Sequence, residues 1–441
     1  MANPTTKEWA VLVYMAADVS APGMHRAAQR SLLQMADMGS TDQVYVAAQI
    51  DSAADHFTRR YIFPPKPADT DSWVVLPKES IPDTNSADPL TILKFFAWGI
   101  SECPAKNIML VFWAHGFGLD DYQPTGVWPI AFPAPGPTAT TFSFFPTDGA
   151  KEISIPAKNF VEPLDNNTFR AIVDEHFHKV LDNNQIGDVV RGCREMLGEG
   201  NGDLAILGMD CCEMAMAEVW CEMTGGAQIG IASQAGIPYS SWPYDLLLAK
   251  LQAEPEAAPD TVAHMMVDSY AEFYNSRKKP AYVTLSACNL NLCIELEAAV
   301  KPLAEALAAV SGDVKARKGI FSARNSSPSF DPDGYIDLDC FCAFLSEDVP
   351  DDRVRQACGP VRHVLKKFVI DSVFSPQDPD RMISLSKGVS VWFPPWIEDP
   401  LVGEDQKKQS EAYLWHGYGG TQFAEKTGWD VFLKNMVNNN P

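Results

Sequence analysis

Short runs of consecutive apolar residues recur along the chain, and each run ends in polar residues or glycine. Residues 10–16, 44–50 and 107–114 form three such runs, which have the length and composition of strands buried on both faces. Segments with apolar residues at helical spacing lie between them, at 24–37 and 88–103. Strands that alternate with helices predict an α/β fold with a mostly parallel central sheet covered on both faces.

The pattern of apolar and polar positions also predicts the remaining strands and helices. An alternating segment at 58–63 indicates an antiparallel companion strand, and further strands are expected at 203–210, 228–236, 281–286 and 388–393. Helices are expected at 167–181, 186–196, 244–253, 259–276, 291–311, 351–372 and 429–437. The pattern of predicted strands and helices changes after residue 312. We therefore predict a core domain over 1–311 and a C-terminal subdomain over 312–441, packed on the core.

The region between residues 117 and 149 is rich in proline and glycine and keeps no periodicity. Such a composition predicts a long surface loop, of the kind that either covers a site or is mobile. The loop separates the strand predicted at 107–114 from the next helical segment.

The stretch over 203–218 is a buried strand that turns into a helix-forming segment. Asp210 and Cys212 stand at the turn, and if the strand's period of two holds they project to one side and Cys211 to the other. A thiol at the carboxyl end of a strand, against a helix N-terminus, lies where a thiolate is stabilised.

His115 and Gly116 follow the strand predicted at 107–114. Because the carboxyl ends of parallel strands share one edge of a sheet, His115 and Cys212 are candidates for one site. A cysteine nucleophile needs a nearby base, usually histidine. Gly116 lets the backbone approach a substrate, so that its N–H can hold an oxyanion. The alternative is a structural thiol and an ordinary loop histidine.

The composition limits the classes of molecule that the chain is expected to bind. The 441 residues carry a formal net charge of −22, which argues against nucleic acid and favours a cationic ligand or peptide, although acidity is also an ordinary solubility device. The N-terminus shows no signal-peptide pattern, which favours the cytoplasm or export by an unrecognised route, and no membrane association is expected.

The ten cysteines form no regular framework, which is typical of reduced thiols in a protein core rather than of disulfides. Cys340 and Cys342 have no further cysteine or histidine at the spacing of a zinc site.

Short motifs of distinctive sequence are spread along the chain. They lie at residues 9–18, 58–61, 115–116, 210–218, 232–233, 242–245, 284–287, 335–338 and 388–394. Together these motifs resemble the clostripain-like cysteine peptidases, and the matches run in the order found in that family, from near residue 9 to near residue 433. The family belongs with caspases, legumains and gingipains. The resemblance therefore implies a caspase-like three-layer αβα sandwich with a mostly parallel central sheet.

The resemblance also assigns roles. The family histidine falls on His115 and its nucleophile on Cys212, and the amides of Gly116 and Cys212 would form the oxyanion hole. No third catalytic residue is implied. The expected activity is that of a cysteine endopeptidase that acts on a peptide or protein through an acyl-enzyme.

Relatives prefer Arg or Lys before the scissile bond and hold it with acidic groups. Asp210 matches one of these groups, and an acidic pocket suits a guanidinium. Ser240 falls where a second aspartate is usual, so basic selectivity should be weakened without being abolished. The alternative role for Asp210 is that of a helix cap.

The resemblance raises two further expectations. Relatives often mature by cutting themselves between the histidine and the cysteine, where Lys151 and Lys158 are candidate positions. Some relatives depend on calcium, but residues 331–334 have the wrong ligand spacing and indicate a turn. We therefore expect no cofactor and no metal site, and we place His176 and His178 on a polar helix. The sequence indicates no oligomeric state.

Two other functions remain open at this point. The chain can be a catalytically silent caspase-like scaffold that binds peptides or proteins. Retention of both His115 and Cys212 argues against that reading. It can also be a transpeptidase that uses the same acyl-enzyme.

Overall fold

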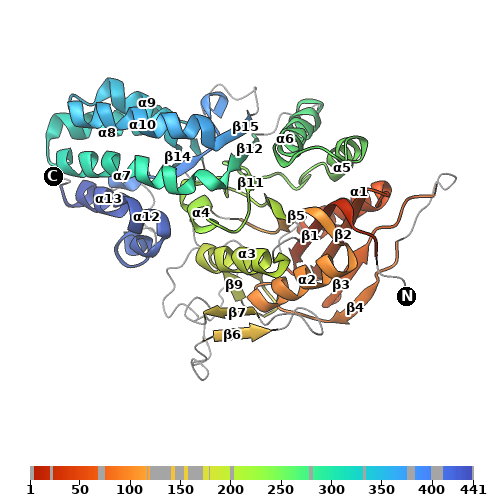
Figure 1. Cartoon of the computed structure of the whole chain (residues 1–441). Helices are drawn as coiled ribbons and strands as arrows, with labels where there is room; N and C mark the ends of the chain where they lie inside the picture. The colour runs from red at the N-terminus through yellow and green to blue at the C-terminus, as the bar shows by residue number, and fades with distance from the viewer. Residues whose placement is uncertain are drawn as a thin grey trace. The chain divides into compact units, whose positions relative to one another are not determined.

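The chain forms two compact units in a computed structural model (Figure 1). The first unit comprises Met1–Gly208 and Tyr239–Ala257, and the second comprises Met209–Pro238 and Ala258–Pro441. The structure describes residues 4–19, 23–67, 75–116, 118–119, 141–144, 153–156, 172–177, 179–198, 203–277, 282–330, 334–374, 383–398 and 411–439. Residue 312 falls inside the second unit, and the domain boundary drawn there remains a prediction.

The centre of the first unit is β1 (Lys7–Ala17), which pairs in parallel with β2 (Val44–Ser52) and with β5 (Ala105–Trp113). Residues 9–17 of β1 are all buried. This is why the strand is apolar throughout instead of alternating, as expected for a strand covered on both faces. The three buried strands predicted from the sequence are confirmed.

The sheet of this unit is completed by antiparallel neighbours. β3 (Phe57–Ile62) pairs antiparallel with β2, and β4 (Glu79–Pro82) pairs antiparallel with β3. With β10 (Asp203–Asp210) the strand order is β10-β5-β1-β2-β3-β4. The chain passes into the second unit within β10, after Gly208. The predicted antiparallel companion strand is confirmed, and the sheet is mixed.

Helices pack on this sheet. In the view of Figure 1, α1 (Met24–Met38) lies above β1 and β2, and α2 (Pro89–Glu102) and α3 (Asn183–Leu197) lie below them. The remaining helix of the described part of this unit is α5 (Tyr244–Ala253). A Cβ added at Gly99 of α2 would lie 2.8 Å from a methyl carbon of Leu12 in β1. The glycine therefore permits close packing of helix on strand.

Two hairpins follow β5. They pair β6 (Thr141–Phe144) with β7 (Ile153–Pro156), and β8 (Ile172–Asp174) with β9 (Lys179–Leu181). The helix predicted over 167–181 is therefore wrong, because β8 and β9 occupy described residues of that segment. β-branched residues favour strands, and the Asp174 carboxylate accepts the Phe177 N–H at 2.9 Å, which closes a turn.

The hairpin changes the position of His176. The residue lies in the turn between β8 and β9 rather than on a polar helix. His178, Lys151 and Lys158 lie outside the described residues, as does most of the loop predicted at 117–149.

The second unit contains two sets of strands. β11 (Ile229–Ala232), β12 (Thr284–Asn289) and β15 (Val369–Phe374) pair antiparallel in the order β15-β12-β11. β13 (Ser329–Phe330), β14 (Tyr335–Asp337) and β16 (Ser390–Trp392) form a small antiparallel sheet.

Helices make up most of the rest of this unit. Figure 1 shows the helices between residues 293 and 368 gathered side by side. The described helices are α4 (Ala217–Glu222), α6 (Pro259–Asn275), α7 (Cys293–Val310), α8 (Val314–Ser326), α9 (Leu338–Asp348), α10 (Asp352–Phe368), α12 (Gln422–Thr427) and α13 (Trp429–Asn438). The described 3₁₀ turns are η2 (Leu290–Leu292), η3 (Ile383–Leu385), η4 (Pro395–Ile397) and η5 (Tyr418–Gly420).

The α/β class predicted from the sequence is confirmed. Among the helices of the described residues, none is long and apolar enough to cross a lipid bilayer. All ten cysteines lie in the described part of the chain and are free thiols, as their scattered positions predicted.

Candidate active site

His115 lies two residues after β5, in the first unit. The strand is buried from Ile108 to Trp113, and the histidine itself is only partly exposed. Burial lowers the pKa of His115 below its ordinary value, while the negative charge of Glu175 opposes that shift. A lowered pKa keeps the imidazole neutral near pH 7, which is the form that can accept a proton from a thiol. Gly116, the next residue, is buried.

Ser240 lies in the same unit, on a loop held at both sides. The indole N–H of Trp113, at the end of β5, donates to the Ser241 hydroxyl at 2.8 Å. On the other side, Arg30 of α1 donates to the Tyr239 carbonyl at 3.1 Å. Ser240 is half-buried between these contacts. The strand that leads to the candidate histidine thus also positions the loop that carries Ser240.

Cys212 lies two residues after β10, in the second unit. It alone is not buried among the ten cysteines, all of which lie in the described part of the chain. The neighbouring Cys211 is only 3% exposed. This difference agrees with the expectation that Cys211 and Cys212 project to opposite sides. Only a thiol that solvent can reach can attack a substrate carbonyl.

The segment after β11 supports the Cys212 sulfur. The Ile237 backbone N–H donates to Cys212 Sγ, with 3.1 Å between nitrogen and sulfur. A hydrogen bond to the charged form of a group favours that form, so this N–H favours the thiolate. Nothing in the sequence around Cys212 indicates this donor, because the two residues are 25 positions apart.

The backbone after Cys212 is held against the same segment. Glu213 has a φ of +60°, a region that non-glycine residues seldom adopt. Its N–H donates to the Ala235 carbonyl at 3.2 Å, and the Ala215 N–H donates to the Ser233 carbonyl at 2.9 Å. These bonds fix the turn between β10 and α4, and with it the position of the thiol.

Asp210 ends β10 and is only 4% exposed. Tyr270 of α6 lies within electrostatic range of both Asp210 and Cys212. Burial raises the pKa of Tyr270 well above its ordinary value, and negative charges on Tyr274, Asp210 and Cys212 raise it further. The tyrosine is therefore neutral, and the second unit presents a buried carboxylate close to the candidate nucleophile.

The sequence-predicted residues thus divide between the units. His115, Gly116 and Ser240 belong to the first unit, and Asp210 and Cys212 belong to the second. The pairing of His115 with Cys212 remains a prediction, as do the oxyanion hole and the acidic pocket.

A family model described as the clostripain family matches residues 178–390. This segment contains Asp210, Cys212 and Ser240, and His115 precedes it. No curated protein matches the chain.

Solved structures resemble the chain over nearly its whole length. A secreted C11 cysteine protease from Bacteroides thetaiotaomicron, in complex with an irreversible peptide inhibitor, has a TM-score of 0.59 and 17% identity, covering 96% of this chain and 99% of that one. An inactive zymogen C11 protease from Parabacteroides distasonis has a TM-score of 0.58 and 16% identity, covering 96% and 99%. At these identities the likeness shows the fold, which is the caspase-like fold expected from the resemblance.

Proposed function

The chain is a cysteine peptidase of the clostripain family, and on this premise we propose that it cleaves peptide bonds with His115 as base and Cys212 as nucleophile. The observation that carries the proposal is the contrast among the cysteines: only Cys212 is accessible, and its sulfur accepts a backbone N–H at 3.1 Å. The lowered pKa of His115, caused by burial, supports the second role.

The proposed reaction proceeds in two halves. Neutral His115 takes the thiol proton, and the thiolate attacks the peptide carbonyl to form a tetrahedral oxyanion held by the amides of Gly116 and Cys212. The imidazolium then protonates the leaving amine, which leaves a thioester. Water, deprotonated by His115, attacks that thioester, and release of the carboxylic acid returns the proton to the resting dyad.

We further propose that Asp210 and Ser240 line the pocket for the residue before the scissile bond. Asp210 is a carboxylate at the end of β10 that is 4% exposed, and a carboxylate is the natural partner of an arriving guanidinium or ammonium group. Ser240 offers a hydroxyl where a second carboxylate is usual in the family. The pocket therefore favours Arg or Lys with one charge pair instead of two.

A set of covalent probes tests the nucleophile and the pocket together. Acyloxymethyl ketones that differ only in the residue at P1, for example Arg, Lys, Gln and Leu, would be incubated with the purified full-length protein. We expect labelling by the Arg and Lys probes that is lost in Cys212→Ala. The control is Cys211→Ala, which changes a neighbouring buried thiol and should be labelled normally.

The outcomes separate the competing functions. If no probe labels the wild-type protein, the silent peptide-binding scaffold is favoured. If the Gln or Leu probe labels as fast as the Arg probe, the basic pocket is contradicted while the nucleophile stands. Hydrolysis in the presence of an added amine distinguishes the peptidase from the transpeptidase, because only the transpeptidase would yield mainly the amide.

A second variant tests the base. His115→Asn should lower kcat/KM by about 10²- to 10⁴-fold, the usual contribution of a positioned general base. His25→Asn, on α1 in the same unit, is the control. Equal activity of His115→Asn and the wild type would exclude the dyad.

A further inference from the structure

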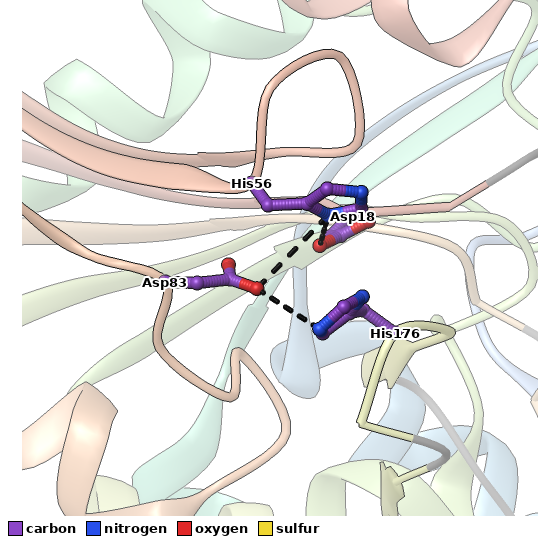
Figure 2. Close-up of side chains that lie close together, drawn as sticks. All are labelled: Asp18, His56, Asp83 and His176. Carbon is purple, nitrogen blue, oxygen red and sulfur yellow. Dashed lines mark hydrogen bonds and ion pairs between the residues drawn. The ribbon is translucent and has the colours of Figure 1, made fainter.

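Four side chains from distant parts of the sequence converge in the first unit, and none of them is among the candidate residues described above. Asp18 follows β1, His56 lies on the turn between β2 and β3, Asp83 follows β4, and His176 lies on the turn between β8 and β9. Figure 2 shows the two imidazoles and the two carboxylates facing one another. We call these four residues the His₂Asp₂ cluster.

The ligand atoms of the cluster lie at the spacing of a metal site. Asp18 Oδ2 and His56 Nδ1 are 3.4 Å apart, and Asp83 Oδ2 lies 4.0 Å from His56 Nδ1 and 3.4 Å from His176 Nε2. One ligand atom from each residue lies within 4.8 Å of every other. Tetrahedral zinc with bonds of about 2.0–2.1 Å separates neighbouring ligand atoms by roughly 3.4 Å. Small side-chain movements would therefore complete the tetrahedron.

Buried negative charge supplies a second, independent reason to expect a cation. The Asp18 side chain is 3% exposed, and two more buried carboxyl groups, Asp51 and Asp174, lie within electrostatic range of Asp18 and Asp83. An ion at the cluster would offset this concentration of carboxylates.

Neighbouring hydrogen bonds hold the segments that carry the cluster. The Glu175 N–H donates to the Asp18 carbonyl at 3.0 Å, which ties the β8–β9 turn to the end of β1. The Ser86 N–H donates to Asp174 at 2.7 Å and its hydroxyl to Asp51 at 2.5 Å, which ties the segment after β4 to the same group. Ordered second-layer contacts of this kind orient the ligands of metal sites.

The chemistry of the donors selects the ion. Calcium and magnesium take oxygen ligands, and calcium takes six to eight of them. Two imidazole nitrogens and two carboxylate oxygens instead suit zinc or a similar transition metal, and four protein ligands are typical of a structural site. We propose that Asp18, His56, Asp83 and His176 bind one zinc ion, which clamps the ends of β1 and β4 to the two turns.

Bound zinc would also affect the surroundings of His115, the candidate base. The β8–β9 turn that supplies His176 also supplies Glu175, whose charge acts on His115. Zinc at the cluster would hold that turn in place. The proposal itself stands without the peptidase mechanism, because it rests on the cluster alone.

Metal binding can be tested on the full-length protein in a Cys212→Ala background, which removes the accessible thiol as a competing ligand. After dialysis against a chelator, zinc would be titrated by calorimetry and Co²⁺ by visible absorption. We expect binding of one ion per chain, the intense absorption of tetrahedral Co²⁺, displacement of Co²⁺ by zinc, and no displacement by excess calcium. Zinc should also raise the Tm.

Two variants and a matched control locate the ion. His176→Gln and His56→Asn each remove one ligand and should weaken zinc binding at least about tenfold. Asn is chosen at position 56 because the residue has a φ of +53°, which Asn tolerates. The control is His264→Gln, which removes a histidine that contacts Asp371 at 2.7 Å on the second unit and should bind zinc normally.

Three results would overturn the proposal. One is a wild-type protein that binds neither zinc nor Co²⁺, since the cluster would then be a set of ion pairs. Another is unchanged binding in both His176→Gln and His56→Asn, because the ion would lie elsewhere. The third is displacement of Co²⁺ by calcium as readily as by zinc. The first and third results are measured on protein that keeps all four cluster residues. They therefore decide the question even if one of the histidine variants folds poorly.

Discussion

At the scale of single residues, the two neighbouring thiols show what a sequence pattern can decide. The period of two along β10 predicts that Cys211 and Cys212 face opposite ways, and the structure buries Cys211 while leaving Cys212 accessible. The Ile237 N–H that contacts Cys212 could not be predicted. Its position depends on where the chain returns after β11, which no local pattern encodes.

The charge of Glu175 gives a prediction for the pH dependence of catalysis. Because that charge raises the pKa of His115, Glu175→Gln should lower this pKa further. If neutral His115 is the base, the acidic limb of the kcat/KM profile should then move to lower pH. The profile, together with an NMR titration of the His115 ring in Cys212→Ala, measures both effects.

Glu256→Gln, at an exposed position of the same unit, is the control and should leave the profile unchanged. An acidic limb that moves to higher pH in Glu175→Gln would contradict the assigned direction of the charge effect.

At the scale of elements, the sequence succeeded where burial is uniform and failed where tertiary contacts override local pattern. β1, β2 and β5 were predicted closely because strands covered on both faces are apolar throughout. The β8–β9 hairpin was mistaken for a helix, and His176 was misplaced with it. The helix expected over 351–372 ends at Phe368, because Val369–Phe374 pairs with β12 instead.

The close packing of β10 yields a stability prediction. A Cβ at Gly208 would lie 2.9 Å from the Trp242 ring and 3.1 Å from Val111. Gly208→Ala should therefore lower the free energy of unfolding by about 1–3 kcal/mol through overpacking. Gly420→Ala places its Cβ where no atom lies within 4 Å and should change stability by less than about 0.5 kcal/mol. Thermal and urea unfolding compare the two, and equal stability would contradict the predicted crowding.

The anchoring of α4 predicts how stability varies with pH. Glu218 accepts the Trp392 N–H and the Tyr418 hydroxyl, each at 2.9 Å, and burial raises its pKa to about 7. The unfolded chain loses this proton near pH 4.3. Between these values the folded state binds more protons, so this contribution to stability falls as pH rises through the window.

Glu218→Gln keeps a carbonyl oxygen for both donors but cannot ionise. The variant should therefore lose less stability than the wild type between about pH 5 and about pH 8, by an amount on the order of 1–3 kcal/mol. Urea unfolding across that range gives the slopes. Glu305→Gln, at an exposed position of α7, should keep the wild-type slope, and parallel slopes for all three proteins would reject the assignment.

At the scale of the whole molecule, the two units are interleaved in sequence. The chain changes unit after Gly208, Pro238 and Ala257. Apolar runs predict elements but carry little information about which elements share a unit, because that depends on contacts between distant segments. The motif order that indicated the family spans both units, which is why the resemblance could assign His115 and Cys212 where periodicity alone left them as separate candidates.

Net charge belongs to this largest scale and leads to a prediction about substrate capture. A chain of formal charge −22 attracts cationic peptides over a distance set by ionic strength, from about 30 Å at 0.01 M to about 3 Å at 1 M salt. Two peptides with the same Arg at P1, one with further lysines and one with glutamines in their place, separate this attraction from the P1 contact. Adding salt should lower kcat/KM several-fold more for the lysine peptide. Equal salt dependence would mean that only the local pocket recognises charge.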